Sequence, residues 1–414
     1  MFKPYRIYFQ QEDKIFYLDE TKNILEEQTI KQKMEDNNYY YYEMFCDYKN
    51  TLESAIEYKH NFDIWCDELK KHNLYYKKYF HHNSAVMLTF KRYSTNQLKS
   101  LQFDAITYDE FKFIESCNNG GLVYFDKQYS NKSVISYGKD YSSFYPSNLS
   151  NSDLQIPIKE GVKFKLKKLK FKTMEYGIYN VKILCDNEDF FKIFSFSKNN
   201  FYTHYSLKFA YEHRKQFNIT FELNLDVEFK ALIYKKEGDL INSSYLFSNW
   251  YNTLMNLKLL YPKNKLIKHL LSSVWGSLCQ YNKIHLNEDE FNKLPDNSIS
   301  DWNDKLETKY KILQEKVFYD KNDEQIINYT LVEPDKAYKN TLARIKPFLI
   351  SFSRNMVGSL ISKKDLFSNV IRIHTDGIVF NKDFDFSDLE YYPKTESKTT
   401  GLIHWTSLNK YSSI

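Results

Sequence analysis

Two aspartates and one lysine, far apart along the chain, have the clearest chemical potential. Asp140 and Asp376 each lie beside a run of residues typical of a β-strand, and Lys268 lies on an apolar segment typical of a helix. Two carboxylates can hold a pair of divalent metal ions, which stabilise both oxygens of an in-line displacement at phosphorus. A lysine ammonium can reach the β- and γ-phosphates of a nucleoside triphosphate. These residue types together predict nucleotidyl transfer.

Each of these residues also has an ordinary explanation when it is taken alone. An aspartate after a strand is commonly a turn former, and a lysine is usually solvated on the surface. Mg²⁺ is the expected ion, because it prefers one or two carboxylates plus substrate phosphates to a complete protein cage. Mn²⁺ is the alternative ion. The hypothesis therefore requires that folding bring Asp140 and Asp376 to one metal pair.

An aromatic turn follows Asp140, with the sequence Phe144-Tyr145-Pro146-Ser147. The Tyr145 ring could stack beneath an incoming sugar and exclude a 2′-hydroxyl. The alternative is a tyrosine that packs within its own turn. The first interpretation fits the chemistry expected of the neighbouring Asp140.

The segments around these residues predict an α+β domain. A short strand at 133–137 precedes Asp140, the strand 370–373 precedes Asp376, and another strand begins at Ile378. This order places the two aspartates at neighbouring strand ends of one sheet.

Helices and further strands are expected between the two aspartates. The predicted elements are an alternating strand at 162–167, two helices in 243–281 interrupted at Pro262, strands at 311–318 and 325–331 joined by the polar turn 320–323, and a helix over 336–361 that presents Arg344 and Arg354. The lysines of 162–167 either follow a phosphate backbone or form a solvated outer face. Both interpretations of these lysines stay open.

Composition limits the class of protein. The 414 residues carry a formal net charge of +5, which permits a nucleic-acid partner without requiring one. The five cysteines are scattered, with no Cys-x-x-Cys pair, so we expect neither a disulfide framework nor a zinc site, and we expect a reducing, cytoplasmic compartment. No apolar run is long enough for a membrane span, so no membrane partner is expected. The abundant Tyr and Phe are interpreted as AT-rich coding bias rather than as an aromatic binding surface.

Taken in order, three segments resemble motifs A, B and C of family B DNA polymerases. They are Asp140–Ser147, Lys268–Gly276 and Arg372–Gly377. The chain is most similar to the protein-primed phage, plasmid and viral branch of that family. Gly120-Gly121 resembles the Tyr-x-Gly-Gly element of this branch, which lies between polymerase and exonuclease regions and contacts template. Lys410-Tyr411 resembles its Lys-x-Tyr element, which grips the primer terminus.

The resemblance implies a role for each matched residue. Asp140 and Asp376 would be the catalytic metal ligands, Tyr145 the sugar-discriminating gate and Lys268 the ligand of the triphosphate. The implied nucleotide-binding residues are Ser143, Phe144, Tyr145, Lys268, Ser272 and Trp275. The implied DNA-binding residues are Gly120, Gly121, Lys410 and Tyr411.

The resemblance also implies a fold. It consists of a polymerase palm, which is an antiparallel sheet with packed helices, together with helical fingers and an N-terminal α+β region. The corresponding division is 1–113 for an N-terminal region that is either degenerate exonuclease-like or partner-binding, 114–242 for the first part of the palm with an insertion, 243–282 for the fingers, and 283–414 for the second part of the palm with motif C and C-terminal strands. The insertion within 148–242 would be of the kind that contacts terminal protein and DNA.

Some positions depart from the family pattern. His374 replaces the first of two aspartates in motif C, which lowers the negative charge and is expected to weaken metal affinity or change the preferred ion. Ser272 and Trp275 replace Asn and Tyr in motif B. Lys410 and Tyr411 are adjacent, without the residue that separates them in the family.

The two ends of the chain differ more strongly from the family pattern. Residues 1–115 contain no Asp-x-Glu, the metal motif of family proofreading, and Asn61-Phe62-Asp63 resembles a second exonuclease motif only faintly, which we interpret as coincidence. Three residues follow Tyr411, so the sequence predicts no thumb. The backbone contacts of a thumb would then come from a terminal (priming) protein or another replication subunit.

The leading hypothesis is a compact, template-directed DNA polymerase without proofreading. It would use Mg²⁺ to add dNTPs to a 3′-hydroxyl of a DNA primer–template, or to a protein-primer hydroxyl, in the replication of a virus or plasmid in the host cytoplasm. Two alternatives stay open. One is a catalytically decayed, polymerase-like nucleic-acid-binding or assembly protein, and the other is a template-independent nucleotidyltransferase.

Overall fold

The computed structural model describes residues 4–11, 14–19, 25–28, 39–79, 81–117, 119–151, 153–223, 228–235, 238–302, 308–319 and 325–413. Contacts within the chain divide it into two units. The first contains 1–101 and 246–277, and the second contains 102–245 and 278–414. The chain therefore enters the second unit, returns to the first for one helical segment, and ends in the second. None of the described helices is long and apolar enough to cross a membrane.

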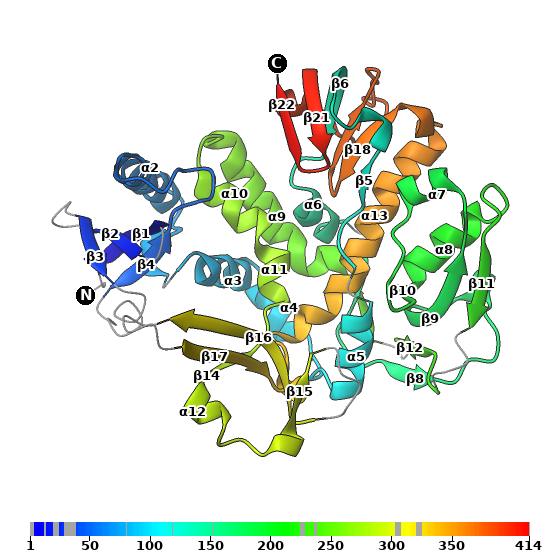
Figure 1. The fold of residues 1–414 in the computed structure, drawn as a ribbon, viewed down its shortest axis with the longest axis horizontal. Helices are drawn as coiled ribbons and strands as arrows, with labels where there is room; N and C mark the ends of the chain where they lie inside the picture. Colours follow the sequence, from blue (N-terminus) through cyan, green and yellow to red (C-terminus); the bar gives the residue numbers. More distant parts are fainter. Residues whose placement is uncertain are drawn as a thin grey trace. The chain divides into compact units, whose positions relative to one another are not determined.

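The first unit combines a four-stranded sheet with helices (Figure 1). In the order β3-β2-β1-β4, strands β1 and β4 run parallel and the other neighbours run antiparallel. The strands are β1 Tyr5–Gln11, β2 Lys14–Asp19, β3 Leu25–Gln28 and β4 Tyr40–Glu43. The helices are α2 Leu52–Lys70, η1 Tyr76–Lys78, α3 His82–Tyr93, α4 Thr95–Ser100, α9 Ser243–Leu260, α10 Lys265–Ser272 and α11 Val274–Leu278. Aromatic rings such as Tyr42 and Phe62, 4.8 Å apart, fill the core between sheet and helices.

The helices predicted for 243–281 are present and the break at Pro262 is confirmed, but the segment forms three helices, α9, α10 and α11, rather than two. Helix α9 ends at Leu260, and α10 begins at Lys265, so the break falls at Pro262. Proline causes the break because it has no backbone N–H to donate and disfavours a helical residue before it. Asn264 then caps α10, since its side chain accepts hydrogen bonds from the first free amides of the helix.

The second unit is built on a seven-stranded sheet whose pairings are all antiparallel among the residues described. Six strands follow the order β22-β21-β6-β19-β18-β5, and β20 pairs with β6. The strands are β5 Val123–Phe125, β6 Lys132–Asp140, β18 Val370–His374, β19 Gly377–Phe380, β20 Lys394–Thr395, β21 Gly401–Ser407 and β22 Lys410–Ser413. The strands predicted next to Asp140 and Asp376 are therefore confirmed, and so is the α+β fold with its antiparallel palm-like sheet (Figure 1).

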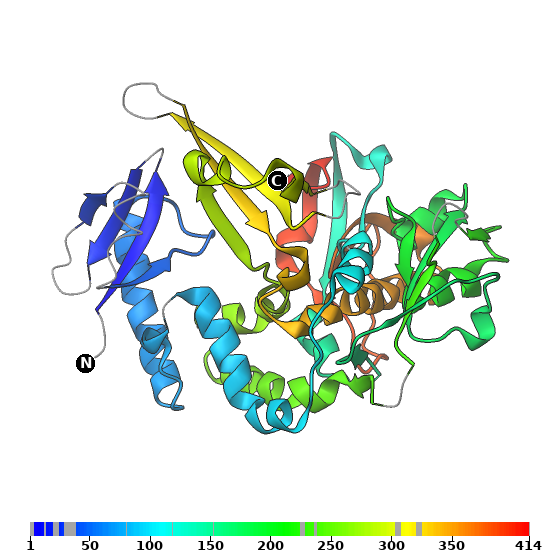
Figure 2. The same ribbon diagram turned by 90° about the horizontal axis from the view of Figure 1, so that it is seen from below.

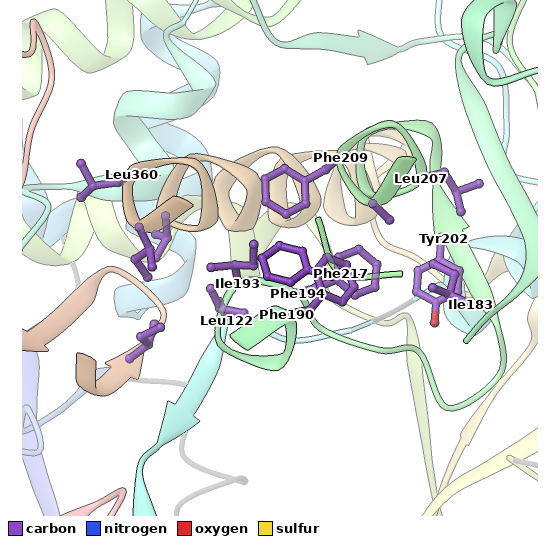
Figure 3. Packing of buried hydrophobic residues seen from close by; sticks show 14 of the residues in the cluster. Leu122, Ile183, Phe190, Ile193, Phe194, Tyr202, Leu207, Phe209, Phe217 and Leu360 are labelled. Carbon is purple, nitrogen blue, oxygen red and sulfur yellow. The ribbon is translucent and has the colours of Figure 1, made fainter. Parts of the chain in front are cut away.

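Helix α13, Ile345–Lys363, packs on one face of this sheet. Alternation along β19 shows why: Ile378 and Phe380 join the core with α13, whereas Val379 faces a second cluster around Trp405 on the opposite face. Helices α7 and α8 cover the other side of α13, and Figure 3 shows the phenylalanine-rich contact between them.

The predicted start of α13 was wrong. The segment expected to be helical from 336 contains only 3-10 turns before residue 345, at Pro334–Lys336 and Thr341–Arg344. Pro347 gives the reason, because proline is tolerated in the first turn of an α-helix but would remove a hydrogen bond from the interior of a helix that began at 336.

Helix α5, Tyr108–Ser116, runs through residue 113, where the sequence division placed a boundary. Its Glu110 is fully buried and accepts hydrogen bonds of 2.7 and 2.6 Å from Arg344. This ion pair joins α5 to the start of α13 within the second unit. The four-region division itself stays a prediction.

The stretch between β6 and α9 forms a separate layer of the second unit. A five-stranded sheet has the order β10-β9-β12-β8, with β11 paired to β9, and β7 pairs with β13. The elements are α6 Phe144–Leu149, β7 Gln155–Pro157, β8 Val162–Phe164, β9 Gly177–Leu184, α7 Glu188–Ile193, β10 Phe201–Thr203, α8 His204–His213, β11 Thr220–Leu223, β12 Ala231–Ile233 and β13 Leu240–Asn242. The strand predicted at 162–167 is present but ends at Phe164.

A further four-stranded sheet lies between α11 and α13 in sequence, in the order β14-β17-β16-β15 (Figure 2). Its elements are β14 Lys283–Asn287, α12 Glu288–Phe291, β15 Ile299–Asp301, β16 Tyr310–Tyr319 and β17 Gln325–Val332. The two strands predicted at 311–318 and 325–331 are confirmed. The turn predicted at 320–323 lies outside the described residues.

Candidate active site

Folding brings the two predicted aspartates to the same sheet edge. Asp140 is the last residue of β6 and pairs in register with Gly377, the residue after Asp376. The Tyr141 amide donates a hydrogen bond of 3.2 Å to the Asp376 carbonyl. A Cβ built on Gly377 would lie 3.5 Å from Asp140 Oδ1. Both carboxylates are therefore placed at one edge by neighbouring strands, as the strand assignments predicted.

The turn that carries Asp376 is tight and strained. Thr375 and Asp376 form the two-residue connection between β18 and β19, and Thr375 has a φ of 62°. A β-branched residue rarely adopts this left-handed conformation, which costs about 1–3 kcal/mol. The Thr375 amide is held by the Leu122 carbonyl at 2.8 Å. The segment around residue 122 thus fixes the position of the Asp376 turn.

The Gly120-Gly121 element contacts this turn directly. A Cβ on Gly121 would lie 2.7 Å from Thr375 Oγ1, so the side chain of Thr375 occupies the space that any larger residue needs. Gly120 is exposed and has no atom near its missing Cβ, but its carbonyl accepts a hydrogen bond from Arg354. The structure therefore gives Gly121 a packing role beside the candidate site, while the DNA contact expected of both glycines stays a prediction.

His374 stands where the family pattern has an aspartate. It ends β18, pairs with Gly377 and has an exposed side chain. In the described part of the chain, no group of three or more His, Cys, Asp or Glu side chains is arranged to hold a metal. Two carboxylates still suit Mg²⁺, because this ion completes its octahedron with water and substrate phosphates.

The turn after Asp140 divides its residues between core and surface. Ser143 has φ 53° and ψ 46°, and this left-handed residue starts α6. Phe144 is 2% exposed and stacks on Tyr141, with ring centroids 4.9 Å apart. The Phe144 ring is thus a core group, so any nucleotide contact there would have to come from its backbone. Ser143 and Tyr145 are only partly buried.

Tyr145 lies within the electrostatic reach of Asp376. The pKa of the Tyr145 phenol is raised to about 12, first by burial and then by the negative charge of Asp376, while the positive charge of Arg354 acts to lower it. The hydroxyl therefore stays protonated at neutral pH and can donate a hydrogen bond. Sequence reasoning placed Arg354 on the long helix but gave it no role, because a single arginine on a helix has no distinctive pattern.

The predicted triphosphate-binding residues belong to the first unit. Lys268 and Ser272 are exposed and lie four residues apart, on the same face of α10. The opposite face buries Leu266, Ile267, Leu270 and Leu271. Trp275, on α11, is partly buried. The amphipathic pattern thus explains why Lys268 projects away from the core.

Lys410 and Tyr411 are neighbours in β22, so their side chains point to opposite faces of the sheet. Tyr411 packs on Trp405 with ring centroids 4.9 Å apart, and the Arg372 guanidinium lies 5.5 Å from the Tyr411 ring. Lys410 is exposed. The two side chains therefore leave opposite faces of the strand, and the grip on a primer terminus that the resemblance implies for them stays a prediction.

The lysines of 162–167 are partly used within the protein. Lys163 forms a salt bridge with Asp109 at 2.5 Å, and Lys165 forms a salt bridge with Glu228. Lys167 is exposed. The solvated-face interpretation thus gains support for the first two lysines, and a phosphate contact by Lys167 stays a prediction.

Asp63, from the faint exonuclease-like segment, has a different environment. Lys77 and Lys59 approach its carboxylate at 2.6 and 3.4 Å, and Tyr5 donates a hydrogen bond to it. Burial would raise the pKa of Asp63, but these donors and charges together hold it below its ordinary value. This carboxylate is already neutralised, which fits the interpretation of the segment as a coincidental match.

The antiparallel sheet, the two aspartates at its edge and the packed helices define a polymerase-like fold. Phi29 DNA polymerase shares this fold: its structure with single-stranded DNA superposes with a TM-score of 0.58 at 12% identity, over 87% of this chain and 58% of the polymerase. The structure of the same enzyme with primer-template DNA and incoming nucleotides gives a TM-score of 0.57 at 12% identity, over 87% of this chain and 59% of the polymerase. No family model and no curated protein sequence matches the chain. At this identity the likeness shows the fold alone, and the chain spans less than two thirds of the polymerase.

Proposed function

We propose that this protein is a template-directed DNA polymerase that adds deoxynucleotides to a 3′-hydroxyl or a protein-primer hydroxyl. The observation that carries the proposal is the meeting of Asp140 and Asp376 at one sheet edge, through the pairing of Asp140 with Gly377. The shared fold with phi29 DNA polymerase supports it, since that enzyme is seen with primer-template DNA and incoming nucleotides. DNA and dNTPs are thus the proposed substrates.

Each site residue has a proposed task. Asp140 and Asp376 would hold the metal ions, whose chemistry is to lower the charge on the reacting phosphate and its attacking and leaving oxygens. Lys268 and Ser272 would bind the triphosphate from the exposed face of α10. Tyr145 would lie under the sugar, where its protonated hydroxyl and ring leave no room for a 2′-hydroxyl. Mg²⁺ is the proposed ion, with Mn²⁺ as the alternative.

A partner protein is part of the proposal. A terminal protein could supply the priming hydroxyl, or another subunit could supply contacts to the duplex. The sequence resemblance to the protein-primed branch supports this partner. The setting would be a viral or plasmid replication system.

The direct test is extension of a labelled primer–template by the purified protein with dNTPs and Mg²⁺ or Mn²⁺. We expect extension that copies the template, and extension that does not depend on a template would instead indicate a template-independent transferase. No incorporation with either ion, alone or with candidate priming proteins, would contradict the proposal.

A second candidate is a catalytically decayed, polymerase-like nucleic-acid-binding protein. It is favoured by His374, an exposed imidazole where a metal-binding carboxylate is expected. Titration with dATP in the presence and absence of Mg²⁺ or Mn²⁺ separates the two candidates. A polymerase binds the nucleotide more tightly with the ion, whereas a decayed protein shows no metal-dependent binding.

A further inference from the structure

Arg354 is a buried cation that no carboxylate neutralises among the residues the structure describes. The residue is 6% exposed, and its Nη1 donates a hydrogen bond of 3.2 Å to the Gly120 carbonyl. Burial lowers the pKa of its guanidinium, and the neighbouring Cys117, Tyr145 and Tyr202 act in the opposite direction. A buried charge is costly unless other groups stabilise it, so these neighbours are expected to be tightly coupled to Arg354.

The contrast with Arg344, one residue before the same helix, is informative. Arg344 is fully buried, but Glu110 accepts two of its hydrogen bonds and the Asp104 and Ala105 carbonyls accept two more. Its charge and geometry are satisfied by the fold alone. Arg354 instead donates to a carbonyl of the Gly120-Gly121 element, and its positive charge lowers the pKa of the Tyr145 phenol.

A second hydrogen bond connects α6, the helix that carries Tyr145, to the residue of α13 next to Arg354. Asn148, three residues after Tyr145 on α6, donates a hydrogen bond of 2.8 Å to the hydroxyl of Ser353, the residue before Arg354. Both Asn148 and Ser353 are 1% exposed. One turn of α13 thus contacts both the Gly120 backbone and the short helix that carries Tyr145.

We propose that Arg354 is a positioning residue that couples the Gly120-Gly121 element to Tyr145 and thereby sets how strictly the site rejects a 2′-hydroxyl. The proposed effect on sugar selection rests on the proposed polymerase function. Arg354 acts through these groups and need not touch the nucleotide. Its planar guanidinium can fix the orientation of the Gly120 carbonyl, which a lysine ammonium does less well, while its charge acts on the Tyr145 phenol through space.

Two variants test the coupling. Arg354→Met removes the charge at similar length, and Arg354→Lys keeps the charge but loses the planar fork. Arg214→Met is the control, because Arg214 lies in the same unit and its guanidinium contacts a neighbour in its own segment, 3.7 Å from the Tyr211 ring and hydrogen-bonded to the Tyr211 carbonyl. If Arg354→Met does not fold, Arg354→Lys carries the test.

The first measurement, hydrogen exchange by mass spectrometry, needs no enzyme activity. We expect faster exchange in peptides covering 119–123 and 143–149 of the Arg354 variants, no change in a peptide covering β9, and no change in either region for Arg214→Met. Unchanged exchange in both regions of the Arg354 variants would overturn the coupling.

The second measurement is the ratio of kcat/KM for a dNTP to that for the matching rNTP. We expect Arg354→Met to lower this ratio about tenfold, as for the loss of one well-oriented hydrogen bond, with Arg354→Lys in between. Equal losses of kcat/KM for the dNTP and the rNTP would indicate that Arg354 has a purely structural role. This result would overturn its proposed role in sugar selection. A wild-type chain that incorporates nothing would contradict the polymerase proposal, and the exchange measurement would then decide the coupling by itself.

Discussion

Two aspartate environments in this protein use the same side chain in opposite ways. In the first unit, Asp63 is surrounded by Lys59, Lys77 and Tyr5, which neutralise its charge. In the second unit, Asp140 and Asp376 meet each other at the ends of paired strands. Bringing like charges together is unfavourable unless a cation joins them, so such a pair is expected to attract metal ions. The difference teaches that neighbouring groups, and not the motif alone, decide whether a carboxylate is a candidate metal ligand.

The largest effect that we expect comes from exchanging one aspartate in each environment. Asp376→Asn should reduce primer extension by roughly 10³-fold, because metal stabilisation of the transition state is worth several kcal/mol. Asp63→Asn, the matched control, should leave extension unchanged. Single-nucleotide incorporation under excess enzyme measures both. Equal losses in the two variants would remove the distinction between the two environments.

A smaller effect is expected from Lys268, the cation of the first unit that we assign to the substrate. Lys268→Ala should lower kcat/KM for dNTPs by about 10–100-fold, as for the loss of a hydrogen bond to a charged group. Lys70→Ala removes another exposed lysine from a helix of the same unit and should have no effect. Steady-state kinetics with varied dNTP measures the change. If both variants behave like wild type, Lys268 has no part in binding the triphosphate.

The turn of Asp376 can be disturbed without touching a carboxylate. Gly121→Ala places a methyl group 2.7 Å from Thr375 Oγ1 and should destabilise the protein by about 1–3 kcal/mol, as overpacking does. Thr375→Gly removes both the obstructing side chain and the positive-φ strain, so it should recover most of this loss in the double variant. Urea unfolding of the wild type, the two single variants and the double variant gives the coupling free energy between residues 121 and 375. Additive effects would mean that Gly121 does not position the Asp376 turn.

The first unit should lose stability in acid because of the buried His82 and the partly buried His269 rather than Asp63 alone. Burial lowers the pKa of His82 to about 3 and that of His269 to about 4, from an ordinary value of 6.5. Because the unfolded chain binds protons below about pH 6.5 and the folded histidines do not, unfolding becomes easier as pH falls from 6.5 towards 4. Each histidine should cost about 1–2 kcal/mol between pH 7 and pH 5.

A single substitution checks this assignment. His269 stacks on Phe45 with ring centroids 5.2 Å apart, and its buried Nε2 has no hydrogen-bond partner among the described residues. His269→Phe should therefore keep the packing and flatten the pH dependence of the urea midpoint. A variant whose midpoint falls with pH as steeply as wild type would show that His269 contributes nothing to acid sensitivity.

Much of the fold was predictable from local patterns, and the exceptions have physical causes. The helices on either side of Pro262, and the strands before and after Asp376, follow from proline geometry and from alternation of apolar residues. The start of α13 was missed because the segment before Pro347 has helical composition but forms 3-10 turns. Local propensity does not decide between an α-helix and a 3-10 turn here, because tertiary contacts such as the Arg344–Glu110 ion pair fix the turn at Thr341–Arg344.

The residues of the candidate site can be proposed from the sequence, but their surroundings cannot. Asp140, Asp376 and Tyr145 carry motif signals, whereas Phe144 belongs to the same motif and is a core ring. Arg354 has no motif signal, because its importance lies in burial and in its contact with Gly120. Lys410 and Tyr411 show the reverse case, in which a motif-like pair is divided between two faces of a strand.

The sequence by itself indicated the strands beside the two aspartates, the helix break at Pro262, the amphipathic face that exposes Lys268, and the two candidate metal ligands. Only the tertiary structure decided the register that pairs Asp140 with Gly377, the approach of two lysines to Asp63, and the contact of one buried arginine with the glycine element next to the site. Periodicity and turn residues are local properties of the chain. Strand register and burial depend on which distant segments pack together, and they decide which charges meet.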